Sequence, residues 1–209
     1  MAERYVITLG RECGAGATYI AQHLSKELGI PYYDKDIFRM VSDKSGVLEE
    51  FFHVNSERPG NNLLYKLVKD LKPADQKPSL GKDIVSPDNL FRFQSELIRE
   101  LADNESCIII GRCADYVLKD HDNCVHVFVC GDMDSKVQRM MHSYSLEESA
   151  AVERIKETDK QRKKYYSYYT GGDWESASNY DLCLNTGDMT IEEAAEQIKL
   201  YLKQKGLME

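Results

Sequence analysis

The chain has 209 residues, of which 42% are hydrophobic and 30% charged, and its formal net charge is −8. This length and composition fit one globular domain of the larger sort. A chain this acidic lacks the overall field that attracts nucleic acid or an anionic membrane, and no apolar run approaches the roughly 18 residues of a membrane-spanning helix. The composition therefore argues against nucleic acid and membranes as partners.

The cysteines form no recognisable framework. No two of them make a C-x-x-C pair, and no Cys/His cluster has the spacing of a zinc site. The N-terminus leads straight into a strand-like run, without the features of a signal peptide. We therefore expect six reduced thiols and a cytoplasmic location. The cysteines are Cys13, Cys107, Cys113, Cys124, Cys130 and Cys183.

The first predicted elements are a strand, a glycine-rich loop and a helix. Residues 5–9 are a short β-branched and apolar run, which predicts a buried strand. Apolar residues then recur at helical spacing from about 17 to 28, and Gly29 is placed to end that helix. Residues 30–33 predict a second short strand, and 36–41 a helical run.

Residues 55–88 are the least regular part of the chain. Prolines and glycines interrupt the segment, which predicts a mobile insertion or lid. The sequence Ser-Pro-Asp at 86–88 starts a clear helix, with proline at the first helical position. The remaining patterns predict, in order, strands at 106–110 and 124–130, a helix at 146–169, a strand at 180–184 and a helix at 191–203.

Strands that alternate with helices predict an α/β fold. Five such strands would form a parallel sheet with helices on both faces. We expect one domain over residues 1–209, with 146–172 as a lid-like helical region.

The loop between the first strand and the first helix is the strongest functional signal. Gly14 and Gly16 stand just before a helix, where glycines let backbone N–H groups turn inward and bind phosphate. The pattern G-x-x-x-x-G-K-[ST] is incomplete, because Arg11 replaces the first glycine and Ala17 replaces the lysine. On the glycines alone, a tight turn that serves packing is the alternative.

Two further segments carry charge suited to phosphate. Arg112 and Asp115 follow a buried strand, at the end where ligands bind in open α/β sheets. The alternative is a surface ion pair between these two residues. Lys156, Lys160 and Lys164 lie on one face of the long helix and could close over phosphates, although such a run is often only a solvated face.

Several motifs together resemble those of the cytidylate-kinase-like proteins, which are relatives of the P-loop nucleoside monophosphate kinases. The matching segments are Ile7–Gly16, Ile30–Lys35, Cys107–Asp115, Asp159–Arg162 and Tyr180–Gly187. The resemblance implies a P-loop kinase fold, and transfer of a phosphoryl group from ATP, with Mg²⁺, to a phosphorylated acceptor such as a nucleoside monophosphate. Its partners would be small-molecule nucleotides. The identity of the acceptor and the oligomeric state stay open.

Carried over by position, the resemblance implies three groups of site residues. The donor nucleotide would bind at Gly14, Ala15, Gly16, Ala17, Thr18, Asn185 and Thr186. The acceptor would bind at Asp34, Arg39, Arg112 and Asp115. The charge of the transferred phosphoryl group would be met by Arg11, Arg162 and Lys163, with Asp159 in the lid. Thr18 could approach Mg²⁺, and no set of protein metal ligands is implied.

The missing loop lysine leaves two functions open. In the first, the chain is a small-molecule kinase in which arginines supply the charge that the lysine would carry. In the second, it is a non-catalytic module that binds a nucleotide or another anion on a kinase scaffold.

Overall fold

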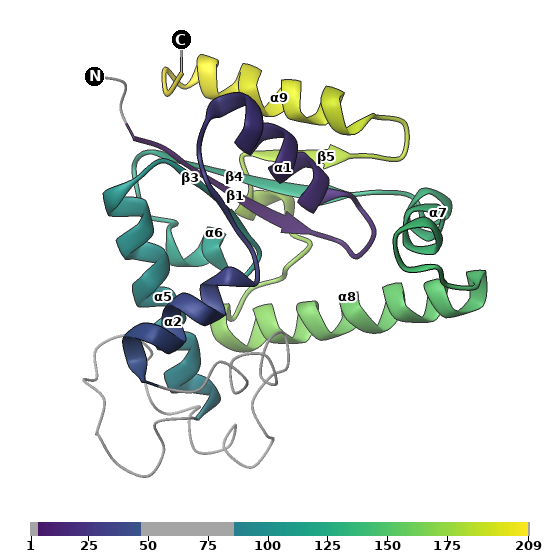
Figure 1. Cartoon of the computed structure of the whole chain (residues 1–209), viewed down its shortest axis with the longest axis horizontal. Coiled ribbons are helices and arrows are strands. Elements are labelled where there is room, and N and C mark those ends of the chain that lie inside the picture. Colours follow the sequence, from purple (N-terminus) through teal and green to yellow (C-terminus); the bar gives the residue numbers. More distant parts are fainter. Residues whose placement is uncertain (1–3, 47–85, 209) are drawn as a thin grey trace.

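The computed structural model describes residues 4–46 and 86–208 (Figure 1). Its centre is a five-stranded sheet with the order β2-β3-β1-β4-β5, in which all neighbouring strands are parallel. The strands are β1 (Val6–Arg11), β2 (Tyr32–Tyr33), β3 (Cys107–Ile110), β4 (Cys124–Cys130) and β5 (Leu182–Asn185). The predicted fold class is confirmed.

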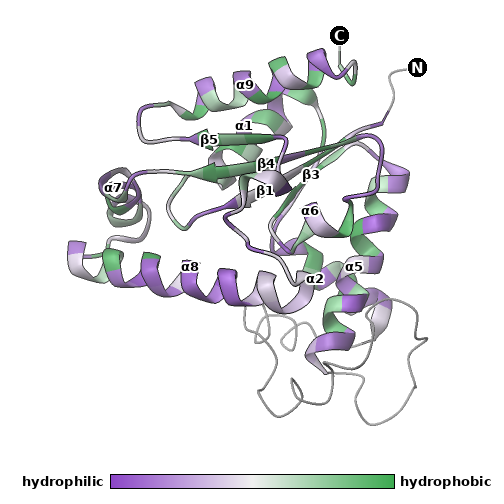
Figure 2. Ribbon diagram, turned by 180° about the vertical axis from the view of Figure 1, so that it is seen from behind, coloured by the Kyte–Doolittle hydropathy of each residue, from purple (hydrophilic) through white to green (hydrophobic). Residues whose placement is uncertain are grey.

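The inner strands are apolar on both sides because helices cover both faces of the sheet. Ile7 and Leu9 point to one face, where they pack against α1 (Ala17–Leu28) and α9 (Ile191–Gln204). Val6 points to the other face, together with Cys107 and Ile109 of β3. That face is covered by α2 (Asp36–Ser45), α5 (Pro87–Asn104) and the short α6 (Ala114–Val117), as Figures 1 and 2 show.

The helix starts follow the predicted signals. Ser86 caps α5 by accepting a hydrogen bond from the backbone N–H of Asn89 at 3.3 Å, with Pro87 at the first helical position. Of the segment 55–88, predicted as a mobile insertion, only these last residues from Ser86 onward lie within the described part. Thr190 and Glu193 form a capping box at the start of α9.

Two helices lie beyond the carboxyl ends of the strands (Figure 1). One is α7 (Met133–Tyr144), which the sequence analysis missed and which Asp132 caps through the N–H of Ser135. The other is α8 (Glu148–Thr170), which matches the predicted long helix and is followed by the 3₁₀ turn Ala177–Asn179. Cys13 packs between these helices against Met140 and Ile155, so the glycine loop and both helices share a small core.

None of the helices in residues 4–46 and 86–208 combines the length and the apolar character that a membrane span requires. None of the six cysteines, all of which lie in the described ranges, forms a disulfide.

Candidate active site

The loop from β1 to α1 has the geometry of an anion-binding nest. Gly14 and Gly16 have φ angles of +82° and +88°, a region that L side chains rarely adopt. Within the described residues, the backbone N–H groups of Gly14, Gly16 and Ala17 meet no hydrogen-bond acceptor. Unsatisfied N–H groups at the positive end of a helix dipole suit a phosphate.

The loop is fixed on one side by α8. The carboxylate of Asp159 accepts a hydrogen bond from the N–H of Cys13 at 2.7 Å, and Arg162 donates to the carbonyl oxygen of Arg11 at 3.2 Å. The same arginine lies 3.6 Å from Asp159. Burial raises the pKa of Asp159, while the N–H of Cys13 and the charge of Arg162 oppose that rise. Asp159 and Arg162, predicted in the lid, thus contact the loop.

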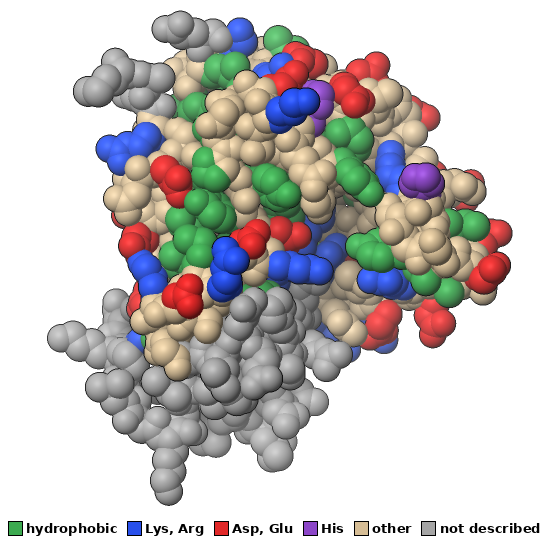
Figure 3. Space-filling view, in the orientation of Figure 1, with side chains coloured by type: hydrophobic (Ala, Val, Ile, Leu, Met, Phe, Trp, Pro, Cys, Tyr) green, Lys and Arg blue, Asp and Glu red, His purple; other side chains and the backbone are tan. Residues whose placement is uncertain are grey.

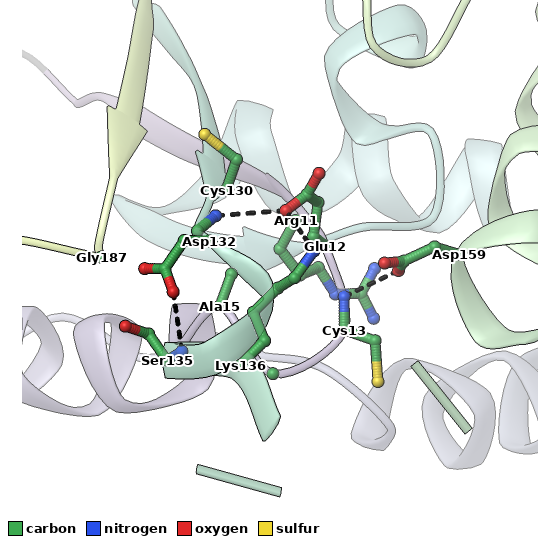
Figure 4. A network of polar contacts seen from close by, with 12 residues as sticks. Arg11, Glu12, Cys13, Ala15, Cys130, Asp132, Ser135, Lys136, Asp159 and Gly187 are labelled. Atoms are coloured by element: carbon green, nitrogen blue, oxygen red, sulfur yellow. Dashed lines mark hydrogen bonds and ion pairs between the residues drawn. The ribbon is translucent and has the colours of Figure 1, made fainter. Parts of the chain in front are cut away.

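On the other side, α7 holds the loop through two basic residues. Oε2 of Glu12 accepts hydrogen bonds from Nζ of Lys136 at 2.9 Å and from the N–H of Gly131 at 3.1 Å (Figure 4). Arg139 donates to the carbonyl oxygen of Gly14 at 3.4 Å and to Oγ1 of Thr186 at 3.2 Å.

Sequence reasoning missed Glu12, Lys136 and Arg139. The signal that could have found the two basic residues is the Asp132 cap, because it starts a helix that places both of them within its first two turns.

Arg11 is the last residue of β1, and its guanidinium reaches the turn after β3. A Cβ atom built on Gly111 would overlap Nη1 of Arg11, so the two residues are in close contact. Arg11 thus lies between the glycine loop and the residues that follow β3. Figure 3 shows Lys and Arg side chains gathered in the recess between the body of the molecule and α7.

Arg112 is buried at the carboxyl end of β3. Its side chain is 5% exposed, lies 3.6 Å from the carboxylate of Asp34, and has its guanidinium 4.1 Å from the centre of the Phe38 ring. Nε of Arg112 has no hydrogen-bond partner among the described residues, and the backbone φ is +63°. Strained backbone at a non-glycine residue costs about 1–3 kcal/mol and gathers at functional sites. The alternative of a surface pair with Asp115 is wrong.

Asp115 faces a different neighbour. Its buried carboxylate accepts a hydrogen bond from the hydroxyl of Tyr166 at 2.7 Å. Burial raises the pKa of Asp115, and the hydrogen bond opposes that rise. A cavity of about 340 Å³ adjoins this pair. It is lined by Asp115, Tyr116, Lys119, His126, Tyr166, Ser178, Asn179, Tyr180 and Asp181.

The remaining predicted residues lie less centrally. Thr18 is exposed on the first turn of α1, and Arg39 is exposed on α2. Thr186 is buried and donates to the carbonyl oxygen of Ala15 at 2.8 Å, which ties the loop to the end of β5, whereas Asn185 accepts a hydrogen bond from a local backbone N–H group.

The basic run along α8 is a solvated face. Lys156, Lys160 and Lys164 are exposed, and Figure 2 shows the helix as hydrophilic along most of its length. Lys163 is also exposed, and it forms ion pairs with Glu175 at 2.6 Å and Asp173 at 3.7 Å, outside the loop.

Comparisons with known proteins identify the family of this chain. The model of the cytidylate kinase-like family matches residues 6–188. The chain belongs to this family. Among curated cytidylate kinases, that of Sulfurisphaera tokodaii is 22% identical over 198 residues (94% of each chain), and that of Methanopyrus kandleri is 26% identical over 204 residues (93% of this chain and 91% of the relative).

Solved structures support the same fold. A protein of Eubacterium ventriosum, described only as uncharacterized, has a TM-score of 0.69 and 27% identity, and the match covers 96% of this chain and 99% of the other. Shikimate kinase from Bacteroides thetaiotaomicron has a TM-score of 0.53 at 14% identity, covering 95% and 98%. The second likeness shows the kinase fold alone.

Proposed function

We propose that this member of the cytidylate kinase-like family transfers the γ-phosphoryl group of ATP to a phosphorylated small molecule, of which a nucleoside monophosphate is the best candidate. One observation carries the proposal. The N–H groups of the glycine loop and the buried guanidinium of Arg112 lie at the ends of the adjacent strands β1 and β3, with Arg11 between them. Two phosphate-binding groups on either side of a cation suit phosphoryl transfer.

The donor triphosphate would bind at residues 14–18. Its phosphate oxygens would accept hydrogen bonds from the loop N–H groups, while Asn185 and Thr186 would lie toward the base. The acceptor would bind across the ends of β2 and β3, with its phosphate at Arg112 and with Asp34, Arg39 and Asp115 around it. An acceptor phosphate would give the buried Nε of Arg112 the partner that the described residues lack.

In the transfer, an oxygen of the acceptor phosphate bonds to the γ-phosphorus atom while the bond to the β,γ-bridging oxygen breaks, and ADP leaves. The protein contributes alignment and fixed positive charge. Arg11 and Arg162 would supply that charge beside the loop. Lys163 is a weaker candidate, because Glu175 and Asp173 engage its ammonium group.

We propose that Mg²⁺ binds together with ATP. No group of three or more His, Cys, Asp or Glu residues in the described ranges could hold a metal ion. In kinases, Mg²⁺ uses one or two protein oxygens together with substrate phosphates. The hydroxyl of Thr18 would be the protein oxygen nearest to the ion. The bound ion would neutralise charge on the β- and γ-phosphates.

The lid, the domain organisation and the location extend the proposal. We propose one kinase domain over residues 1–209, acting in the cytoplasm, with residues 146–172 as the lid. The contacts of Asp159 and Arg162 with the loop support the lid assignment. The mobility of residues 55–85 stays a prediction outside the described part.

A coupled assay of ADP release over a panel of nucleoside monophosphates tests the function. We expect turnover with at least one acceptor, dependent on Mg²⁺. We also expect ATP with Mg²⁺ to raise the melting temperature, because a ligand that binds only the folded state stabilises it. Absence of turnover across the panel would contradict catalysis.

The second candidate is a non-catalytic nucleotide-binding module. Ala17 favours it, because a methyl group stands where the loop pattern has a charged lysine. This candidate predicts a thermal shift with nucleotide and no ADP release with any acceptor, so the same two measurements separate the functions.

A further inference from the structure

The residue at the position of the missing lysine is Ala17, whose side chain carries no charge. Ala17 begins α1, is 3% exposed and packs in the core beneath the sheet-facing side of the helix. A phosphate loop of this type needs a cation at the β- and γ-phosphates, because two adjacent phosphate groups concentrate negative charge there. That cation must therefore come from another element.

Lys136 of α7 already packs against the loop. Its backbone packs so closely on the loop that a Cβ atom on Gly14 would lie 2.9 Å from the carbonyl oxygen of Lys136. The residue is only 6% exposed, which is rare for lysine, and its ammonium group meets Glu12 at 2.9 Å. Because this lysine is buried, a contribution to a solvated surface does not explain its position beside the loop.

Two other nearby cations, Arg139 and Arg11, are less able to take this role. Arg139 is occupied by the carbonyl oxygen of Gly14 and by Thr186, and so it ties the loop to the end of β5. Arg11 extends to Gly111, toward the acceptor side. Lys136 has a flexible four-carbon stem and three donors, and Glu12 is the only side chain that it contacts by hydrogen bond or ion pair in the described part.

We propose that Lys136 replaces the loop lysine, so that its ammonium group leaves Glu12 and contacts the β- and γ-phosphates when a nucleoside triphosphate binds. This inference rests on the proposed nucleotide site. Glu12 can release the lysine because it keeps the hydrogen bond from the N–H of Gly131 at 3.1 Å. The movement is a rotation of the side chain and involves no covalent step.

The test is Lys136→Met, which keeps the stem and removes the charge, with Lys199→Met as its control. Lys199 also forms a lysine–glutamate pair, with Glu27 at 2.7 Å, but it joins α9 to α1 away from the loop. For Lys136→Met we expect the ratio of ATP affinity to adenosine affinity to fall about tenfold or more. We also expect kcat to fall about 10²–10³-fold, as for the loss of one fixed donor. The control should change neither.

Two further measurements separate a role in binding from a role in stability. Glu12→Gln releases the ammonium group, so its ATP affinity should equal or exceed that of the wild type. Lys136→Ala leaves room for an added amine, so ethylamine should restore part of its turnover. If Lys136→Met fails to fold, the double variant Glu12→Gln/Lys136→Met, which leaves no unpaired charge, gives the same affinity ratio.

The outcomes distinguish this inference from the function on which it rests. A Lys136→Met variant with wild-type turnover and an unchanged affinity ratio overturns the inference and leaves the kinase function standing. A wild type that binds ATP without turnover contradicts catalysis, and the affinity ratio then decides on Lys136. A wild type that binds no nucleotide overturns both.

Discussion

The contact between Arg11 and Gly111 allows a test of the role of Arg11 that does not replace Arg11 itself. Gly111→Ala adds one methyl group, and that methyl would overlap Nη1 of Arg11. The guanidinium must then withdraw, because it is the far end of a flexible side chain whereas the turn after β3 is backbone. Gly29→Ala is the matched control, since its φ of +66° is close to the +68° of Gly111 and its new Cβ would meet nothing within 4 Å.

The two substitutions should cost similar stability and differ in activity. A left-handed φ costs an L residue roughly 1–2 kcal/mol, and the loss of glycine from the unfolded chain offsets about 0.4–1 kcal/mol of this. The net is about 1 kcal/mol, or about 2–4 °C in melting temperature at this chain length. If Arg11 meets the charge of the transferred phosphoryl group, a displacement of about 1 Å lowers kcat about 10²-fold in Gly111→Ala alone.

The assay is coupled ADP release at saturating substrates, with melting temperatures measured in parallel. Adding Gly111→Ala to Arg11→Ala should lower kcat little further, because both changes remove the same interaction. Equal turnover in Gly111→Ala and Gly29→Ala would refute the placement of the Arg11 guanidinium at the reacting phosphate.

Three other predictions concern the kinetics, the pH dependence of stability and the thiols. Arg162→Ala should lower kcat about 10²–10³-fold with an intact fold. Arg112→Ala should lower kcat and also raise KM for the acceptor. Unchanged kinetics in both variants would contradict these roles. Because burial raises the pKa of Asp115, folding favours its protonated form, and its contribution to the free energy of unfolding should decline as the pH rises above about 4. Urea unfolding of Asp115→Asn at several pH values should lack that decline, and an equal decline in the variant would contradict the assignment. Titration of freshly purified, denatured protein without reductant should return close to six thiols per chain, and a count near zero would contradict reduced cysteines.

Much of the fold was predictable because its signals are local. The apolar strands, the glycine that ends α1 and the Ser-Pro-Asp start of α5 each depend on neighbouring residues, and all three appear in the structure. The helix α7 was missed because its apolar residues form a short stripe that packs on Cys13 and α8 rather than on the sheet. Without that tertiary partner, its hydrophobic pattern is weak evidence for a helix.

The partners in the site were not predictable, because they join segments far apart in the chain. Arg112 has Asp115 three residues away, yet it pairs with Asp34, while Asp115 pairs with Tyr166 of α8. The backbone at Arg112 is also left-handed, with a φ of +63°, which is uncommon for a residue other than glycine and is not signalled by the sequence. Sequence reasoning could place both residues at the end of β3 but could not choose their partners.

The distribution of charge explains how a chain of net charge −8 can hold nucleotide phosphates. Each of three basic residues of the candidate site is matched by a carboxylate: Arg112 by Asp34, Lys136 by Glu12 and Arg162 by Asp159. Burying one of these cations without a counter-ion would cost several kcal/mol, so the carboxylates make the free site stable.

When a cation leaves its carboxylate for a phosphate, the carboxylate can still keep a hydrogen bond from the backbone. Asp159 keeps the N–H of Cys13, and Glu12 keeps the N–H of Gly131, when the cation beside each turns to a phosphate. A bound phosphate would then replace the carboxylate as the partner of the cation, so that one ion pair is exchanged for another. The N–H groups that remain on the carboxylates lower the free energy that this exchange requires. Electrostatic preorganisation of this kind depends on pairing within the site, which the net charge of the chain does not reveal.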